Sequence, residues 1–281
     1  MIYIITLSLY LLTLIGLGIY KSRQIKTQSD FAVAGRSLSP GVLVGTMLAT
    51  WIGTGSILGN AGKAYETGFA ALMLPLGGIL GIILLTKIAG KVRAYEKFTV
   101  PEIIGDRYGS VARILSVIAL VMAYMVIVSY QYNAGGAVLT TVLTDANGDA
   151  LISAQTGTII AAIFIVAYTM LAGLVSVAYT DVANGILMTI VLVIAFPIFW
   201  IKAGGWSGME MSFGEMGKPN HMQFFGVYSG LDILNFCLPP FLLVLGDANM
   251  YQRFFASKDA KGATQATRIL VFAIVIIELL I

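Results

Sequence analysis

Long charge-free apolar stretches divide the chain into segments of the length that a membrane-spanning helix needs. About 20 apolar residues cross the hydrocarbon core as a helix, and none of these stretches alternates in the way that β-barrel strands do. The pattern therefore predicts eight helical spans. They are Ile2–Tyr20, Leu38–Gly62, Thr67–Thr86, Ile114–Thr144, a span within Ala150–Thr180, Val182–Ile201, a span near Phe225–Gly246, and one that begins near Arg268 and runs to Ile281.

The composition is typical of an integral membrane protein. Hydrophobic residues make up 58% of the 281 residues and charged residues only 11%, whereas a soluble domain is roughly 25% charged. The single cysteine, Cys237, cannot form an internal disulfide, and a net charge of +3 does not indicate nucleic-acid binding. The first span has no basic residues ahead of it and no small-residue cleavage site, so we expect a retained helix rather than a signal peptide.

Basic residues concentrate in alternate loops, which predicts the orientation. Of the 17 Lys and Arg residues, all but Lys63, Lys202 and Lys218 fall in loops 21–37, 87–113 and 247–268 or at their edges. These three loops lie on one side if there are eight spans. We therefore predict a multi-pass protein of the cell (plasma or inner) membrane with its N-terminus outside and the three basic loops in the cytoplasm.

Two of the predicted spans carry residues that weaken a helix. The second span contains "ATWIGTGSILGNAG" (49–62), with a cluster of small residues at its centre, and each glycine costs about 1 kcal/mol relative to alanine inside a helix. The seventh span contains Pro239 and Pro240, and each proline removes a backbone donor. Close packing of neighbouring helices is the alternative explanation for the glycines. In lipid, a broken backbone is tolerated only where protein or a water-filled cavity satisfies it.

The placement of the two weak spans points to an internal repeat. They lie five helices apart, so they run in opposite directions, as a two-fold axis in the membrane plane requires. Freed carbonyl oxygens suit a hard cation such as Na+, and freed amides suit an anionic group. We predict that helical geometry breaks within about Thr50–Ser56 and within about Leu238–Leu242, and that the two breaks face one another.

Five segments at successive junctions carry a resemblance to a known family. They are "DFAVAGRSLSP" (30–40), "ATWIGTGSILGNAGKAYETG" (49–68), "FTVPEIIGDRYG" (98–109), "AGLVSVAYTDV" (172–182) and "DANMYQRFFASKDAKGA" (247–263). In this order they resemble the N-terminal part of the sodium:solute symporters, the family of the sodium–proline and sodium–glucose carriers. The resemblance implies an all-α polytopic fold of the LeuT type, with five-plus-five inverted repeats and an extra N-terminal helix. One transmembrane domain, 1–281, would then comprise the extra helix 1–21, a complete first repeat 38–202 and a truncated second repeat 225–281.

The same resemblance implies the position of the sodium and solute sites. The backbone carbonyls of Ala49 and Ile52 stand at positions that supply sodium ligands in the family. The other sodium ligands of the family come from a core helix that would lie beyond Ile281. Sugar carriers have amide and carboxylate side chains where this chain has Ser56 and Pro75, and proline carriers have an Asp where this chain has Trp51. An ordinary packed aromatic is the alternative for Trp51. The residues expected to contact solute are Trp51, Gly53, Thr54, Gly55, Ser56, Asn235 and Pro239.

The remaining ionisable residues near the spans allow more than one interpretation. Asp181, placed at the start of the sixth predicted span, is either a helix N-cap favoured by the helix dipole or an acid that attracts Na+ toward a cytoplasmic exit. Asp232 is either a functional intramembrane acid or a hydrated acid near the interface. Glu278 lies too close to the end of the chain to be assigned, and His221 is expected to be solvated in an outer loop.

Together these features predict a sodium-coupled symporter that imports a small organic solute by alternating access. Na+ is the expected co-transported ion, no organic cofactor is expected, and nothing indicates the oligomeric state. The chain has no "GxxxxGK[ST]" and no "HExxH", so ATP-driven transport and metallopeptidase chemistry are not supported. The alternatives are a truncated inactive remnant of such a carrier, or a channel or intramembrane enzyme subunit. Since the chain holds only about a third of a second repeat, we expect the 281 residues alone not to transport sodium.

Overall fold

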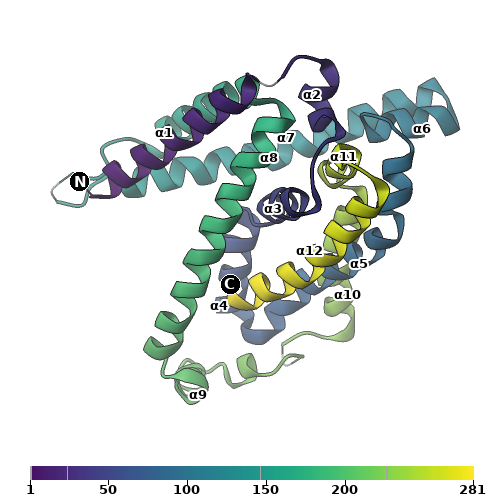
Figure 1. Cartoon of the computed structure of the whole chain (residues 1–281). Coiled ribbons are helices and arrows are strands. Elements are labelled where there is room, and N and C mark those ends of the chain that lie inside the picture. Colours follow the sequence, from purple (N-terminus) through teal and green to yellow (C-terminus); the bar gives the residue numbers. More distant parts are fainter. Residues whose placement is uncertain (1, 24, 146, 226) are drawn as a thin grey trace. The chain divides into compact units, whose positions relative to one another are not determined.

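The computed structural model describes residues 2–23, 25–145, 147–225 and 227–281, and these residues are almost entirely helical (Figure 1). In the described ranges, six helices are long and apolar enough to cross a membrane, and two shorter apolar helices cover Pro40–Trp51 and Ala154–Ala167. Helices occupy all eight predicted positions, which confirms the all-α polytopic class. The chain separates into two compact units, residues 1–37 with 95–180 and residues 38–94 with 181–281.

The first unit includes a long helix that lies in the middle of the chain. Its elements are α1 (Ile2–Ser22), α2 (Gln28–Val33), η1 (Ala34–Arg36), α6 (Val100–Tyr108), α7 (Ser110–Val142) and the first part of α8 (Ala154–Lys202). With 33 residues, α7 is about 50 Å long at 1.5 Å per residue. A bilayer core is about 30 Å thick, so α7 tilts or extends beyond it, as its long apolar stretch predicts.

A complete capping box begins α2. The Thr27 side chain accepts a hydrogen bond from the Asp30 N–H, and the Asp30 carboxylate accepts from the Thr27 N–H. The Lys26 N–H donates to the same carboxylate. These hydrogen bonds, the one from Lys26 first, lower the pKa of Asp30 below its ordinary value, because they favour the charged form. The sequence "TQSD" therefore defines where the chain turns after α1.

The second unit is arranged around α5, the helix against which α10 and α12 both pack; α12 also packs against α3 (Figure 1). Its buried apolar side chains include Met47, Met73, Ile82, Leu85 and Leu270. Its elements are α3 (Pro40–Trp51), η2 (Gly55–Asn60), α4 (Ala61–Thr67), η3 (Gly68–Leu72), α5 (Met73–Ala94), the last part of α8, α9 (Gly205–Glu215), η4 (Pro219–Met222), α10 (Gly230–Gly246), α11 (Ala248–Ala256) and α12 (Ala260–Leu280).

Glycines on α5 permit this close packing. A Cβ added at Gly77 would lie 2.1 Å from the Cys237 carbonyl oxygen of α10, and one added at Gly81 would lie 3.0 Å from the Phe241 carbonyl oxygen. Small residues at such contacts let helix backbones approach each other in lipid. The glycines of α5 are thus required by the α5–α10 contact.

We expect Gly77→Ala to destabilise the protein strongly, because its methyl group would meet the backbone of α10, which cannot move aside cheaply. The matched control is Gly62→Ala on α4, where an added Cβ has nothing within 4 Å and alanine improves helix propensity by about 1 kcal/mol. Thermal unfolding of both purified variants in detergent checks the contrast. Equal melting temperatures for the two variants would show that α5 and α10 are not packed in this way.

Backbone hydrogen bonds tie together three helix ends of the second unit. The Leu38 N–H donates to the Ala256 carbonyl and the Lys258 N–H donates to the Leu38 carbonyl. The Arg93 side chain, at the end of α5, donates from Nε to the Ser257 carbonyl at 2.6 Å. The start of α3, the end of α5 and the turn between α11 and α12 therefore form one anchored cluster.

Two predicted features of the helices are wrong. The fifth and sixth spans separate at Gly173 and not at Asp181, since α8 consists of two helices that meet at a kink where Gly173 has φ 51° and ψ 172°. Glycine adopts this positive φ without a Cβ penalty. The predicted break at Leu238–Leu242 is also wrong, because α10 continues through Pro239 and Pro240.

Candidate functional site

The second predicted span is discontinuous, and the break begins directly after Trp51. Ile52 has φ −77° and ψ 89°, so its carbonyl turns away from the direction of the helix axis. The Gly53 N–H donates to the Trp51 carbonyl at 3.0 Å, whereas a continuous helix would direct it to Ala49, four residues earlier. The prediction of a break within Thr50–Ser56 is confirmed, and the Ala49 carbonyl loses its helical donor there.

After the break the chain continues as a π-helical stretch, η2, from Gly55 to Asn60. The Ser56 hydroxyl donates back to the Trp51 carbonyl at 3.0 Å, so this carbonyl accepts two hydrogen bonds across the break. π-Helical turns are rare and occur frequently at functional sites. Trp51, Gly53, Thr54, Gly55 and Ser56 are thus brought together in one irregular segment, as their closeness in sequence requires.

Asn235 and Pro239 lie on α10, which packs against α5. Within the part of the chain that the structure describes, no hydrogen bond or ring contact joins either residue to the break in α3. The two prolines still remove the donors that a regular helix would offer to the carbonyls of Asn235 and Phe236. The middle of α10 is therefore weakened without being unwound.

Glu278 of α12 connects the two sides of the break. Its Oε1 accepts a hydrogen bond from the indole Nε1–H of Trp51 at 2.6 Å, and its Oε2 accepts from the Asn60 side-chain amide at 2.9 Å. Glu278 is only 6% exposed. Trp51 ends α3 and Asn60 ends η2, so one buried carboxylate bridges the helix before the break and the helical stretch after it.

Sequence reasoning did not assign Glu278 or select Asn60. The available signal was an acid within an apolar helix, which is a functional hypothesis by default. Trp51 also packs its ring on α5, where a Cβ added at Gly78 would lie 2.3 Å from the indole Cη2. Trp51 therefore combines the expected packing of an aromatic residue with a polar link to Glu278.

Asp181 is not a helix cap, because it lies inside α8, eight residues beyond Gly173. Its carboxylate accepts a hydrogen bond from the Thr46 hydroxyl of α3 at 2.6 Å and pairs with the Arg253 guanidinium of α11 at 3.4 Å. The Asp181 and Arg253 side chains are 19% and 8% exposed. A largely buried charge pair thus connects three helices on the side of α3 that precedes the break.

Two other polar residues have structural partners. Asp232 forms a capping box with Ser229 at the start of α10, so it satisfies the backbone of a helix end. His221 was expected to be solvated, but it is 5% exposed and its Nε2 lies 2.6 Å from the Glu66 carbonyl oxygen. The segment between α8 and α10 contains α9 and η4, and the His221 side chain is buried there.

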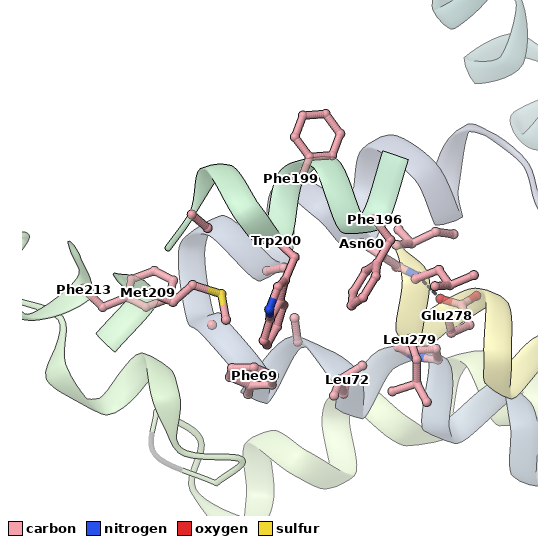
Figure 2. A pocket seen from close by; sticks show the side chains of 17 residues that line it. Asn60, Phe69, Leu72, Phe196, Phe199, Trp200, Met209, Phe213, Glu278 and Leu279 are labelled. Atoms are coloured by element: carbon pink, nitrogen blue, oxygen red, sulfur yellow. Dashed lines mark hydrogen bonds between the residues drawn. The ribbon is translucent and has the colours of Figure 1, made fainter. Parts of the chain in front are cut away.

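A cavity of about 360 Å³ adjoins the Glu278 carboxylate. Figure 2 shows Phe196 and Trp200 of α8 pointing toward Phe69 and Leu72, while Phe199 points away. The residues that line it are Asn60, Ala64, Gly68, Phe69, Ala71, Leu72, Pro75, Phe196, Phe199, Trp200, Ala203, Met209, Phe213, Glu278, Leu279, Leu280 and Ile281.

Comparison with a solved structure defines the class of fold. The chain resembles a Na+-coupled sialic acid symporter, solved in a substrate-bound outward-open state, with a TM-score of 0.81 and 18% sequence identity over 100% of this chain and 58% of that one. A discontinuous first core helix in an all-helical membrane protein is typical of the LeuT-like fold. The fold predicted from the sequence segments is therefore confirmed.

Sequence comparison identifies the family. A model of the sodium:solute symporter family matches residues 31–281, so the chain belongs to this family, whose members are transporters and not enzymes. The sodium/proline symporters of Staphylococcus aureus strains JH9 and JH1 are each 24% identical over 275 residues. These alignments cover 94% of this chain and 52% of each relative, so the chain spans about half the length of the curated relatives it matches.

Proposed function

We propose that this chain forms the sodium- and solute-binding part of a sodium-coupled symporter that imports a small organic solute by alternating access. The observation that carries the proposal is the break after Trp51, where Gly53 donates to Trp51 instead of to Ala49. Broken helices at membrane depth bind ions and substrates in secondary transporters. Family membership supports the same function.

In this proposal Na+ is the transported ion, and the carbonyls of Ala49 and Ile52 are two of its ligands. A hard cation prefers oxygen ligands, and the turn at Ile52 supplies carbonyls that the helix no longer uses. Asp181 is the acid that attracts the cation toward the cytoplasmic exit, and the hydrogen bond that it accepts from Thr46 places its carboxylate beside α3, the helix that carries Ala49. Trp51, Thr54 and Ser56, with Gly53 and Gly55, form the solute side of the break, opposite Asn235 and Pro239.

The test is uptake of a panel of labelled solutes by proteoliposomes that contain the full natural protein carrying these residues. We expect one solute class to accumulate only under an inward Na+ gradient, with K+ in place of Na+ as the control. Uptake that is independent of Na+ would instead indicate a channel. Insertion without uptake of any solute would support an inactive remnant of the family.

The orientation proposed from the basic loops has its own test. In a Cys237→Ser background, a cysteine at Glu215 in α9 should react with an impermeant maleimide added to intact cells, whereas a cysteine at Lys261 in α12 should react only after permeabilisation. Both positions are exposed. Labelling of the Lys261 position in intact cells would reverse the proposed orientation.

A further inference from the structure

The Glu278 carboxylate is buried without a counter-charge. Both of its hydrogen-bond partners, the Trp51 indole and the Asn60 amide, are neutral. Among the described residues, no cationic side chain pairs with it, and it is the only ionisable residue that lines the cavity. A buried charge is costly unless it is paired, so the site favours a ligand that brings a positive charge.

The rest of the cavity is suited to the same kind of ligand. The rings of Phe196 and Trp200 are stacked, with centroids 5.8 Å apart, and both point into the space between α8 and η3 (Figure 2). Phe69 lies across from them and pairs with Trp206 at 5.1 Å. Aromatic faces attract organic cations through the ring quadrupole, most strongly where water is excluded.

The size of the cavity limits the ligand to a small molecule. About 360 Å³ lies at the lower end of the range for small-molecule sites. An inorganic cation would fill little of this volume and would gain nothing from its apolar walls. A cation that carries methyl or methylene groups uses both the carboxylate and the rings.

We propose that this cavity binds a small organic ammonium ion, with its charged nitrogen beside Glu278 and its alkyl groups against Phe196, Trp200 and Phe69. None of the residues proposed above to contact the transported solute lines this cavity, so the inference goes beyond the proposed function and the binding requires no transport. Because Glu278 also holds Trp51 and Asn60, the bound ammonium contacts the group that bridges the broken helix. A ligand bound in the cavity therefore affects the geometry of the break through Glu278.

The test compares three ammonium ions with uncharged analogues of the same shape, using the 281-residue chain in detergent. The probes are choline with 3,3-dimethyl-1-butanol, tetramethylammonium with neopentane, and betaine aldehyde with 3,3-dimethylbutanal. Binding is followed by quenching of tryptophan fluorescence and by the shift in melting temperature. We expect at least one cation to bind at least tenfold more tightly than its neutral analogue.

Three variants locate the site. Glu278→Gln keeps the shape and an acceptor for Trp51 and should weaken binding of the cation at least tenfold without affecting the neutral analogue. Trp200→Leu should weaken it several-fold, while the control Phe272→Leu, at an α12 side chain that is 72% exposed and does not line the cavity, should leave it unchanged. If Glu278→Gln fails to fold, the contrast between Trp200→Leu and Phe272→Leu still decides the outcome.

The proposal is overturned if none of the three cations binds more tightly than its neutral analogue, or if Trp200→Leu and Phe272→Leu bind alike. Failure of the proposed function looks different, since it appears as uptake that is absent or independent of Na+ in proteoliposomes. Cation binding without sodium-driven uptake would keep this site and reject the transport proposal. Sodium-driven uptake of uncharged solutes only, without cation binding, would keep the transport proposal and reject this binding site.

Discussion

Replacing Gly53 or Gly55 with leucine is expected to abolish sodium-driven uptake while the protein still inserts into the membrane. Gly53 donates to the Trp51 carbonyl inside the break, and Gly55 begins the π-helical stretch. Leucine favours regular helix by close to 1 kcal/mol relative to glycine, and its side chain would occupy space beside the freed carbonyls. Uptake by proteoliposomes containing the full natural protein measures the loss.

The matched control for these variants is Gly62→Leu. Gly62 lies seven residues beyond Gly55 in the same helical run, and an added Cβ meets nothing within 4 Å. This variant should insert and transport like the parent protein. Normal uptake by both break variants would show that Gly53 and Gly55 serve only close packing.

Breaking the pair between Asp181 and Arg253 is expected to cost of the order of 3 kcal/mol of stability, because a buried charge loses its partner. In Asp181→Asn the Arg253 guanidinium remains buried, and its Nε already has no hydrogen-bond partner in the described structure. In Arg253→Met the Thr46 hydroxyl is the one polar partner that the carboxylate keeps among the described residues. Thermal unfolding of each single variant measures the effect.

The double variant, Asp181→Asn with Arg253→Met, separates the pair from the individual residues. It should recover most of the lost stability, since neither charge is then left alone. If Asp181 also guides the cation, Asp181→Asn should lower the sodium dependence of uptake modestly. An unchanged sodium response together with lower stability would assign the acid to helix packing alone, and additive losses in the double variant would contradict a direct pair.

The membrane class and the helix positions could be read from the order of apolar residues, because a bilayer requires about 20 of them for each span. The break after Trp51 could be predicted for a local reason. Three glycines between Gly53 and Gly59 remove the side chains that stabilise a helix, and no distant contact is needed to produce that effect. Family membership followed from short segments whose order is preserved.

Features that depend on partners from other helices could not be predicted. Pro239 and Pro240 weaken α10 locally, yet packing against Gly77 and Gly81 of α5 keeps it helical. Asp181 has the local sequence of a helix cap, but its position inside α8 and its pairing with Arg253 depend on how α3, α8 and α11 come together.

The sequence by itself determined where the apolar helices lie along the chain, the irregular segment around Gly53 and the family. Only the tertiary structure decided that Glu278, 227 residues from Trp51 along the chain, bonds to both ends of that segment. The physical reason is that hydropathy and helix propensity act over a few residues, whereas a buried carboxylate is satisfied by whichever donors the packing of α3, η2 and α12 places beside it.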